Sequence, residues 1–269
     1  DLSNQIPGFS IIGLADKALG EAQQRVHNAC ANSDLSLPRR HVTVNLSPAN
    51  LPKRGSALDV AIAIAAVATE APLDRQSLSE TVHLGELGLD GRLRPVSGVL
   101  PAVLAAARAG FRRVIVPHGN LAEAELVDGI EVRGAVTLRD VARAHGLDVA
   151  DVDAEPVAAL EAAGTDDTQT PDLADVIGQR DAVEALIVAA AGGHHLLMSG
   201  PPGAGKTMLA KRLPGLLPDL DDATALQVAS IRSLAGLRVT TLRRRPPFEA
   251  PHHTASAVAL VGGGSRVLQ

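Results

Sequence analysis

The sequence predicts a mixed protein of two domains, an α+β domain followed by the first part of an α/β domain. Strand-like and helix-like segments alternate over the first 148 residues of the 269. An acidic stretch rich in small residues interrupts this alternation at residues 150–170. After it, an apolar run, a glycine-rich loop and a helical pattern follow directly on one another, which is the order found in α/β ligand-binding units.

The N-terminal elements are predicted from hydrophobic periodicity. Phe9–Leu14 is a short apolar run typical of a strand, and a helical pattern follows over Asp16–Ala31. His41–Leu46 alternates polar and apolar residues, as a half-buried strand does. Ala57–Thr69 is an apolar helix, and Ser56 before it is predicted to be its N-cap.

A hairpin and a second apolar helix follow. Val82–Leu87 and Gly91–Arg94 flank Asp90-Gly91, a dipeptide that favours a tight turn. Val99–Ala109 predicts a helix that Gly110 ends.

The last elements of the first domain lead into a linker. Arg113–Pro117 predicts a short strand, and Thr137 with Asp140 resembles a capping pair at the start of a helix. Residues 150–170 predict a solvated linker, with a surface helix over Val157–Ala163 as the alternative. We therefore expect domains at residues 1–149 and 171–269.

The second domain contains the strongest motif. Asp181–Ala191 predicts a helix, His194–Met198 a short buried strand and Gly205–Leu213 another helix. The loop between the last two matches G-x-x-x-x-G-K-[ST] and consists of Gly200, Pro201, Pro202, Gly203, Ala204, Gly205, Lys206 and Thr207.

This pattern predicts a P-loop that binds ATP with Mg²⁺. Glycines let the backbone wrap so that its N–H groups point at phosphate oxygens. Lys206 is expected to contact the β- and γ-phosphates, and the Thr207 hydroxyl to ligate Mg²⁺. Hydrolysis also needs an acidic residue at the end of a neighbouring strand. Asp219, Asp221 and Asp222 do not fit that place, because their stretch reads as a solvated loop.

Composition places limits on location and partners. The net charge of −5 excludes a uniformly basic nucleic-acid-binding surface, although Arg243-Arg244-Arg245 is locally basic. The single cysteine, Cys30, fits a reducing cytoplasm. No apolar run has the length of a membrane span, so we expect a cytoplasmic protein without a membrane partner. The first and last residues show no terminal pattern, and we expect a piece of a longer protein.

Two further stretches carry a family resemblance. Asp175-Val176-Ile177-Gly178-Gln179 precedes the P-loop, and Pro247–Thr254 follows it. Both resemble the magnesium-chelatase-like AAA+ ATPases, and more closely the competence-associated ComM/YifB subfamily. The resemblance covers essentially the whole chain.

The resemblance implies several properties. They are a Lon-protease-like α+β domain before a partial AAA+ module, a hexameric ring and ATP-driven branch migration of DNA. Val176 and Ile177 would border the adenine, and Pro251–Thr254 would lie near the insert that faces substrate. The acidic Mg²⁺ site, the sensors and the arginine finger would lie beyond Gln269. By itself this chain is then expected to bind ATP without efficient hydrolysis, so that no catalytic residue beyond Lys206 is assigned.

The Lon-like domain is expected to be inactive as a peptidase. Against the Lon pattern, the serine position falls on Ala57 and the lysine position on Ala102. No lysine occurs between Lys53 and Lys206, so Ser56 has no downstream lysine within the domain.

Other residues leave alternatives open. His194-His195 and His252-His253 lack the companions of a metal site. The second pair favours a nucleic-acid or subunit contact, or else loop structure. Arg243–Arg245 is either a phosphate contact or a solvated turn, and His83 with Glu86 is predicted to be surface chemistry. The alternatives to a DNA motor are a magnesium-chelatase motor subunit, which loads Mg²⁺ into a porphyrin, and a non-catalytic nucleotide-binding assembly factor.

Overall fold

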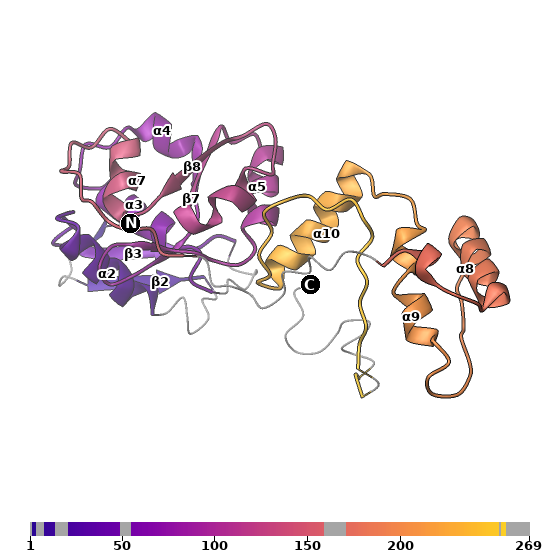
Figure 1. Cartoon of the computed structure of the whole chain (residues 1–269). Coiled ribbons are helices and arrows are strands. Elements are labelled where there is room, and N and C mark those ends of the chain that lie inside the picture. The colour runs from indigo at the N-terminus through magenta and orange to yellow at the C-terminus, as the bar shows by residue number, and fades with distance from the viewer. Residues whose placement is uncertain are drawn as a thin grey trace. The chain divides into compact units, whose positions relative to one another are not determined.

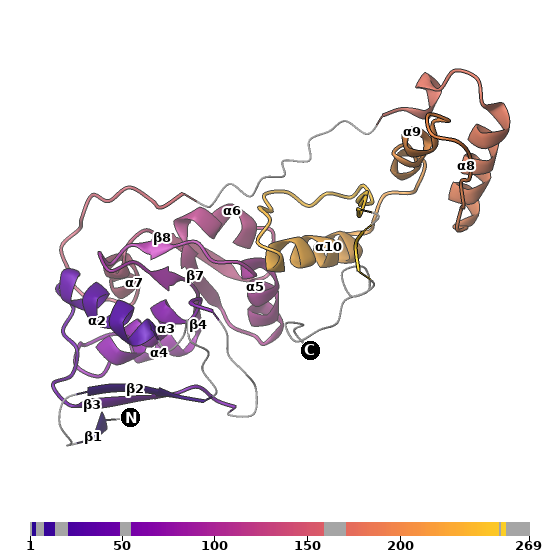
Figure 2. The same ribbon diagram turned by 90° about the horizontal axis from the view of Figure 1, so that it is seen from below.

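The computed structural model describes residues 2–3, 8–13, 21–48, 55–158, 171–252 and 254–256. The chain divides into two compact units (Figures 1 and 2). The first unit consists of Asp1–Thr165 with Leu226–Leu242, and the second of Asp166–Ala225 with Arg243–Gln269.

The first unit contains strands and helices in mixed order. Its strands are β1 (Leu2–Ser3), β2 (Gly8–Ile12), β3 (His41–Asn45), β4 (Thr81–His83), β5 (Glu86–Leu87), β6 (Leu93–Arg94), β7 (Arg113–Pro117) and β8 (Glu131–Ala135). Its helices are α2 (Ala22–Asn32), α3 (Asp59–Val67), α4 (Arg75–Ser79), α5 (Val99–Arg108), the 3₁₀ turn η1 (His118–Asn120), α6 (Leu121–Ala124) and α7 (Leu138–Ala144).

The strands form two three-stranded sheets and a hairpin. One sheet has the order β1-β3-β2, with β2 parallel and β1 antiparallel to β3. The other has the order β4-β7-β8 and is parallel throughout. β5 and β6 pair antiparallel across the Asp90-Gly91 turn, and the mixed α/β character is confirmed.

The central strand β7 shows why this sheet is covered on both faces. Val114 and Val116 pack in one hydrophobic core with α5 and α6, whereas Ile115 packs in the other with α3 and α7. All three are at most 1 % exposed. Successive side chains of a strand point to opposite faces, so a continuous apolar run is what a strand buried on both sides requires.

Several predicted elements of this unit are confirmed. The strands at 41–46 and 113–117 and the helix at 99–109 agree within one residue. Thr137 and Asp140 form a reciprocal capping box at the start of α7. The predicted helices at 16–31 and 57–69 begin later, at Ala22 and Asp59, and residues 14–20 lie outside the described residues.

Two details of the first unit differ from prediction. Ser56 is not the cap of α3, because the helix begins at Asp59 with Leu58 at the N-cap and no side-chain cap. The Ser56 hydroxyl instead donates to the Glu86 carboxylate. The predicted strand at 82–87 is divided at Gly85, whose φ of +140° turns the chain from β4 into β5.

His83 was predicted to be a surface residue, and this is wrong. Its side chain is 8 % exposed, and its Nε2 lies 2.8 Å from the Nε2 of His145, which is fully buried. The other ring nitrogen of His145 bonds the Ser77 hydroxyl at 2.9 Å. Burial and the neighbouring His145 lower the pKa of His83 to about 3. The pair is therefore neutral in the fold, with one ring donating to the other.

Acidification is expected to destabilise the first unit through this pair. An unfolded histidine takes up a proton below about pH 6.5, whereas folded His83 does not until near pH 3, so the stability that the pair confers is full above pH 6.5 and falls as pH drops. Lowering the pH from 7 to 5 should therefore reduce the free energy of unfolding by about 2 kcal/mol through His83. Urea denaturation of His83→Gln should show a flatter pH dependence. His27→Gln, at an exposed histidine, should keep the pH dependence of the unaltered chain. If the free energy of unfolding fell equally with pH in both variants, His83 would not be the group that makes the unit sensitive to acid.

The second unit contains short helical elements. They are η2 (Leu173–Asp175), α8 (Arg180–Gly192), α9 (Lys206–Ala210) and η3 (Leu213–Gly215). The first residues of α10 (Asp222–Leu234) also belong to it, while its residues from Leu226 belong to the first unit. The helix predicted at 181–191 is confirmed as α8, and the helix predicted at 205–213 ends early at Ala210.

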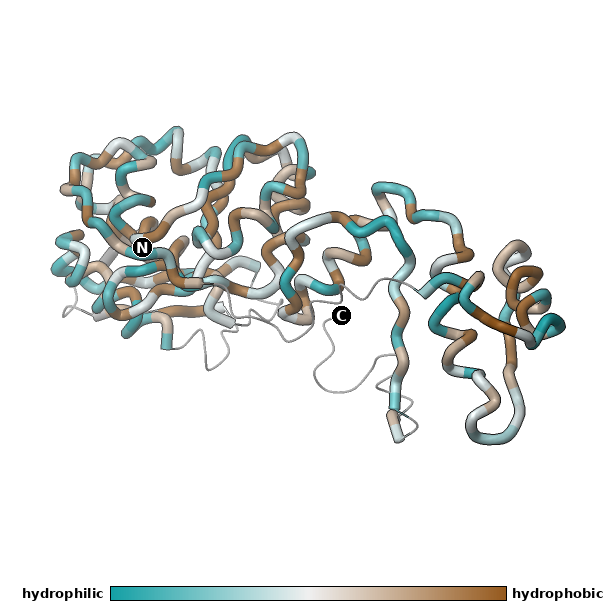
Figure 3. The backbone as a smooth tube through the Cα atoms, in the orientation of Figure 1, coloured by the Kyte–Doolittle hydropathy of each residue, from teal (hydrophilic) through white to brown (hydrophobic). Residues whose placement is uncertain are grey.

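Two predictions for the second unit are wrong. Residues 194–200 form no strand, and Leu197 is 93 % exposed. The segment that follows α8 contains a hydrophobic stretch, drawn in brown in Figure 3. A strand needs a neighbour for its backbone hydrogen bonds, and none of the described residues of this unit is in a strand. Asp222 was placed in a loop but begins α10, whose first turn is closed by Thr224 N–H donating to the Asp221 carboxylate at 2.7 Å.

The predicted linker is irregular where the structure describes it. Residues 151–158 have no regular structure. The alternative helix at 157–163 is absent at 157–158, and its remainder lies outside the described residues. No helix within the described part of the chain combines the length and hydropathy that crossing a bilayer would require.

Candidate functional site

The glycine-rich loop joins α8 to α9 in the second unit. Gly203 and Gly205 have φ of +81°, where a side chain would be strained, and Gly205 is the N-cap of α9. The amide of Ala204 donates to the carbonyl of Pro201 at 3.3 Å, which closes a tight turn. The motif spacing therefore corresponds to two left-handed backbone positions just before a helix.

Lys206 folds back across this loop. Its Nζ donates to the carbonyl oxygens of Gly200 and Pro201, each at 2.8 Å. Thr207, one residue later on α9, is exposed. The structure thus brings the ammonium group over the mouth of the loop and leaves the Thr207 side chain in solvent.

The segment predicted to border an adenine lies next to the loop. A Cβ built on Gly205 would come within 3.0 Å of the Gln179 Nε2, so this side chain packs against the loop backbone. Ile177 is 96 % exposed and Val176 is partly buried. Single exposed apolar residues are common on protein surfaces, and the open side chain of Ile177 offers apolar surface for contact with a flat ring.

Arg212 connects the same two parts and was not predicted from the sequence. Its Nε donates to the carbonyl of Asp172 at 2.7 Å, and its Nη1 to the carbonyl of Met208 at 2.9 Å. It therefore ties the end of α9 to the segment before Val176. A lone arginine in a helical pattern gives no signal of such a contact.

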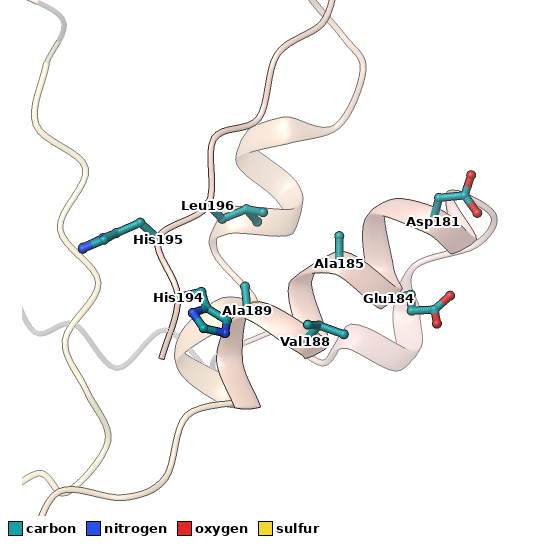
Figure 4. A pocket seen from close by; sticks show the side chains of 8 residues that line it. All are labelled: Asp181, Glu184, Ala185, Val188, Ala189, His194, His195 and Leu196. Atoms are coloured by element: carbon teal, nitrogen blue, oxygen red, sulfur yellow. The ribbon is translucent and has the colours of Figure 1, made fainter. Parts of the chain in front are cut away.

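His194 and His195 lie on different sides of the chain. His194 turns toward the last turn of α8, where Gly192 leaves room for its ring, whereas His195 points away from that helix (Figure 4). Asp181 and Glu184 line the same shallow pocket at the opposite end of α8. Within the described residues, no three His, Cys, Asp or Glu side chains gather as metal ligands.

The two stretches after α10 are held by local contacts. Arg244 pairs with Asp222 at 2.7 Å, so the centre of the Arg243–Arg245 stretch is engaged within the unit. His252 Nδ1 bonds the Thr254 hydroxyl at 2.7 Å, and the amide of Ala255 donates to the carbonyl of His252 at 2.8 Å. His253 lies outside the described residues.

The first unit was predicted to lack a serine–lysine pair. Ser56 bonds Glu86, while Lys53 lies outside the described residues. Asp59 is fully buried and pairs with Arg25, its Oδ2 accepting from Nε at 2.5 Å and its Oδ1 from Nη2 at 3.0 Å. The Leu87 amide also donates to Asp59, at 3.2 Å. Sequence reasoning missed this bidentate ion pair, because Asp59 reads as an ordinary first-turn acid.

Two family profiles match the chain, one in each part. The profile described as "Subunit ChlI of Mg-chelatase" matches residues 1–120. The profile described as "Magnesium chelatase, subunit ChlI" matches residues 172–269 and so includes the glycine-rich loop.

Curated relatives match over nearly the whole chain. An uncharacterised protein of Mycobacterium tuberculosis is 49% identical over 271 residues, which is 98% of this chain and 52% of that protein. The competence protein ComM of Haemophilus influenzae is 45% identical over 267 residues, with the same two coverages. YifB of Escherichia coli is 40% identical over 269 residues, 98% of this chain and 51% of that protein. The chain thus spans about half the length of these relatives.

A more distant likeness concerns the N-terminal part. The mitochondrial Lon protease homologue of Drosophila melanogaster is 29% identical over 151 residues, which is 51% of this chain and 14% of that protein. The family profiles and the relatives identify the same family as the two stretches on either side of the P-loop. The chain is a member of the magnesium-chelatase-like ComM/YifB family.

Proposed function

We propose that the loop at Gly200–Thr207 binds ATP with Mg²⁺. The observation that carries this proposal is the position of Lys206, whose Nζ is held over the loop by two backbone carbonyls. An ammonium with only carbonyl partners gains more from a phosphate, since charge-assisted hydrogen bonds are the stronger ones. The left-handed glycines support the same reading, because they allow backbone N–H groups to turn toward an anion.

Each residue of the site has a role in this proposal. The backbone of Gly200–Gly205 cradles the phosphates, Lys206 contacts the β- and γ-phosphates, and the exposed Thr207 hydroxyl ligates Mg²⁺. Val176 and Ile177 border the adenine, in keeping with the exposure of Ile177. Mg²⁺ bound with the nucleotide would offset the charge on the phosphates.

The domain plan belongs to the same proposal. Residues 1–149 form a Lon-like domain without peptidase activity, 150–170 a linker and 171–269 the first part of an AAA+ module. The division into compact units and the two profile matches support this plan, although the unit boundaries fall at different residues.

The whole protein is proposed to be an ATP-driven motor that moves branched DNA in recombination or transformation. Support comes from family membership and from the relative whose name is "Competence protein ComM". We further propose a hexameric ring in the cytoplasm, with this part of the chain binding ATP and hydrolysing little of it alone. The alternative is a motor subunit for metal insertion into a porphyrin, which the chelatase profiles favour.

ATP hydrolysis by the full-length protein separates the two functions. Added fork or four-way-junction DNA is expected to raise the hydrolysis rate severalfold, while a porphyrin with chelatase partner subunits leaves it unchanged. The DNA should be tested at several salt concentrations, because phosphate contacts weaken as salt rises. Stimulation by the porphyrin and its partners, with no response to any DNA, would replace the DNA motor by the alternative.

A further inference from the structure

A pocket in the first unit has no part in the proposed function. Its volume is about 460 Å³. It lies between the β5–β6 hairpin with the residues after it, the η1–α6 turn, residues 157–158, and the end of α10 with the segment that follows. This volume is within the range of small-molecule sites, roughly 300–1,000 Å³. Figures 1 and 2 show α10 beside α5, and Ala229 and Val239 share a hydrophobic core with α5.

The acidic side chains of this pocket already have hydrogen-bond donors. Glu123 accepts from the amide of Leu100 and from the side chain of Asn120, each at 3.2 Å. The Asn120 side chain also bonds both the amide and the carbonyl of Val96, each at 3.0 Å. Glu86 accepts from the Ser56 hydroxyl. Both carboxylates are therefore engaged in hydrogen bonds within the fold.

Two arginines and a serine of the pocket differ from these carboxylates, whereas Arg92, which also lines the pocket, pairs with Asp90 at 2.7 Å. Arg94 and Arg238 are exposed, and within the described residues neither is in an ion pair. Ser233 also lines the pocket and is 2 % exposed, yet its hydroxyl has no hydrogen-bond partner among the described residues. A buried hydroxyl left unpaired costs free energy, so this site is incomplete without a further acceptor.

We propose that this pocket binds a small organic phosphate. A phosphate offers three acceptor oxygens and negative charge, which match two guanidinium groups and a hydroxyl. Apolar groups at Val96, Ala122 and Val239 line the same pocket and give an organic body a surface that inorganic phosphate cannot use.

Calorimetry with phenyl phosphate tests the proposal on the chain that carries Lys206→Ala, so that the P-loop does not contribute. Saturable binding is expected. Inorganic phosphate, which lacks the apolar ring, and phenol, which lacks the phosphate, should each bind at least about tenfold more weakly. Absence of saturable binding, or equal binding of phenyl phosphate and phenol, would overturn it. The result does not depend on whether the P-loop binds ATP.

Variants of the lining locate the site. Arg94→Ala and Arg238→Ala should each weaken binding about tenfold, whereas Arg108→Ala, at an exposed arginine outside the pocket, should leave it unchanged. Ser233→Ala should weaken binding severalfold without lowering the unfolding midpoint, because the hydroxyl has no partner to lose. A lower midpoint with unchanged binding would make Ser233 structural and overturn its role, and unchanged binding in both arginine variants would overturn the site.

Discussion

Replacing Asp59 by alanine is expected to lower the free energy of unfolding of the first unit by about 3–5 kcal/mol. The carboxylate is fully buried and makes two hydrogen bonds to Arg25, whose side chain is 18 % exposed. Burial raises the pKa of Asp59 more than Arg25 lowers it, so the pair does not fully offset the cost of removing its charges from water. Loss of Asp59 removes both close hydrogen bonds to the Arg25 guanidinium and leaves Glu21, at 4.0 Å and 62 % exposed, as a weaker ionic partner.

Urea denaturation followed by circular dichroism measures this loss, since the chain has no Trp and no Tyr. Glu80→Gln is a matched control, because Glu80 pairs at 3.4 Å with Arg112, which is 76 % exposed, and should cost less than about 1 kcal/mol. The double variant Arg25→Met/Asp59→Leu should recover part of the loss, because apolar side chains of similar size need no compensating charge. The recovery is partial, because the buried Leu87 amide still loses its acceptor. A small effect of Asp59→Ala alone would show that water reaches the pair.

The elements that the sequence predicted correctly are those whose local and tertiary requirements agree. Arg113–Pro117 contains an unbroken apolar run, and the centre of a parallel sheet requires one. Thr137 and Asp140 carry the start of α7 within three residues, so no distant contact is needed to form the cap. Gly110 follows α5 with a φ of +83°, which few other residues tolerate.

Three of the wrong predictions, those for His83, Ser56 and residues 194–198, depend on contacts far away in the sequence. His83 has its partner 62 residues later in His145, and alternation along one strand cannot reveal that its polar face is covered. Ser56 bonds Glu86, 30 residues away, instead of the helix beside it. The segment at 194–198 has the composition of a strand, but composition supplies no neighbouring strand, and the hydrogen bonds of a sheet depend on one.

In the candidate site, the sequence likewise predicts the local features and misses those that depend on packing. The motif places Lys206, Thr207 and the glycines in order, because a loop cradle is a local structure. Gln179 and Arg212 hold the segment before α8 against the loop and against the end of α9, and that contact depends on how the two parts pack. The pocket around Ser233 has no local signal, since its walls come from four separate stretches of chain.

Lys206→Ala is expected to weaken ATP binding at least about 100-fold, because each hydrogen bond to a charged phosphate contributes roughly 1.5–3 kcal/mol. A fluorescent ATP analogue titrated into the chain in the presence of Mg²⁺ measures the dissociation constant. Lys211→Ala is the matched control, since Lys211 is exposed at the end of the same helix and should bind the analogue as the unaltered chain does. Equal affinity of both variants would count against the P-loop assignment.

The same substitution should also change the loop when no nucleotide is present. Lys206 bonds the carbonyls of Gly200 and Pro201, so its removal takes away two contacts that close a turn rich in left-handed glycines. Hydrogen exchange of the loop amides should therefore be faster in Lys206→Ala than in Lys211→Ala. ATP with Mg²⁺ should slow that exchange in the Lys211 variant only, because the phosphates replace the carbonyls as partners of the ammonium group. Protection by ATP in both variants would mean that the backbone of the loop holds the nucleotide without the lysine.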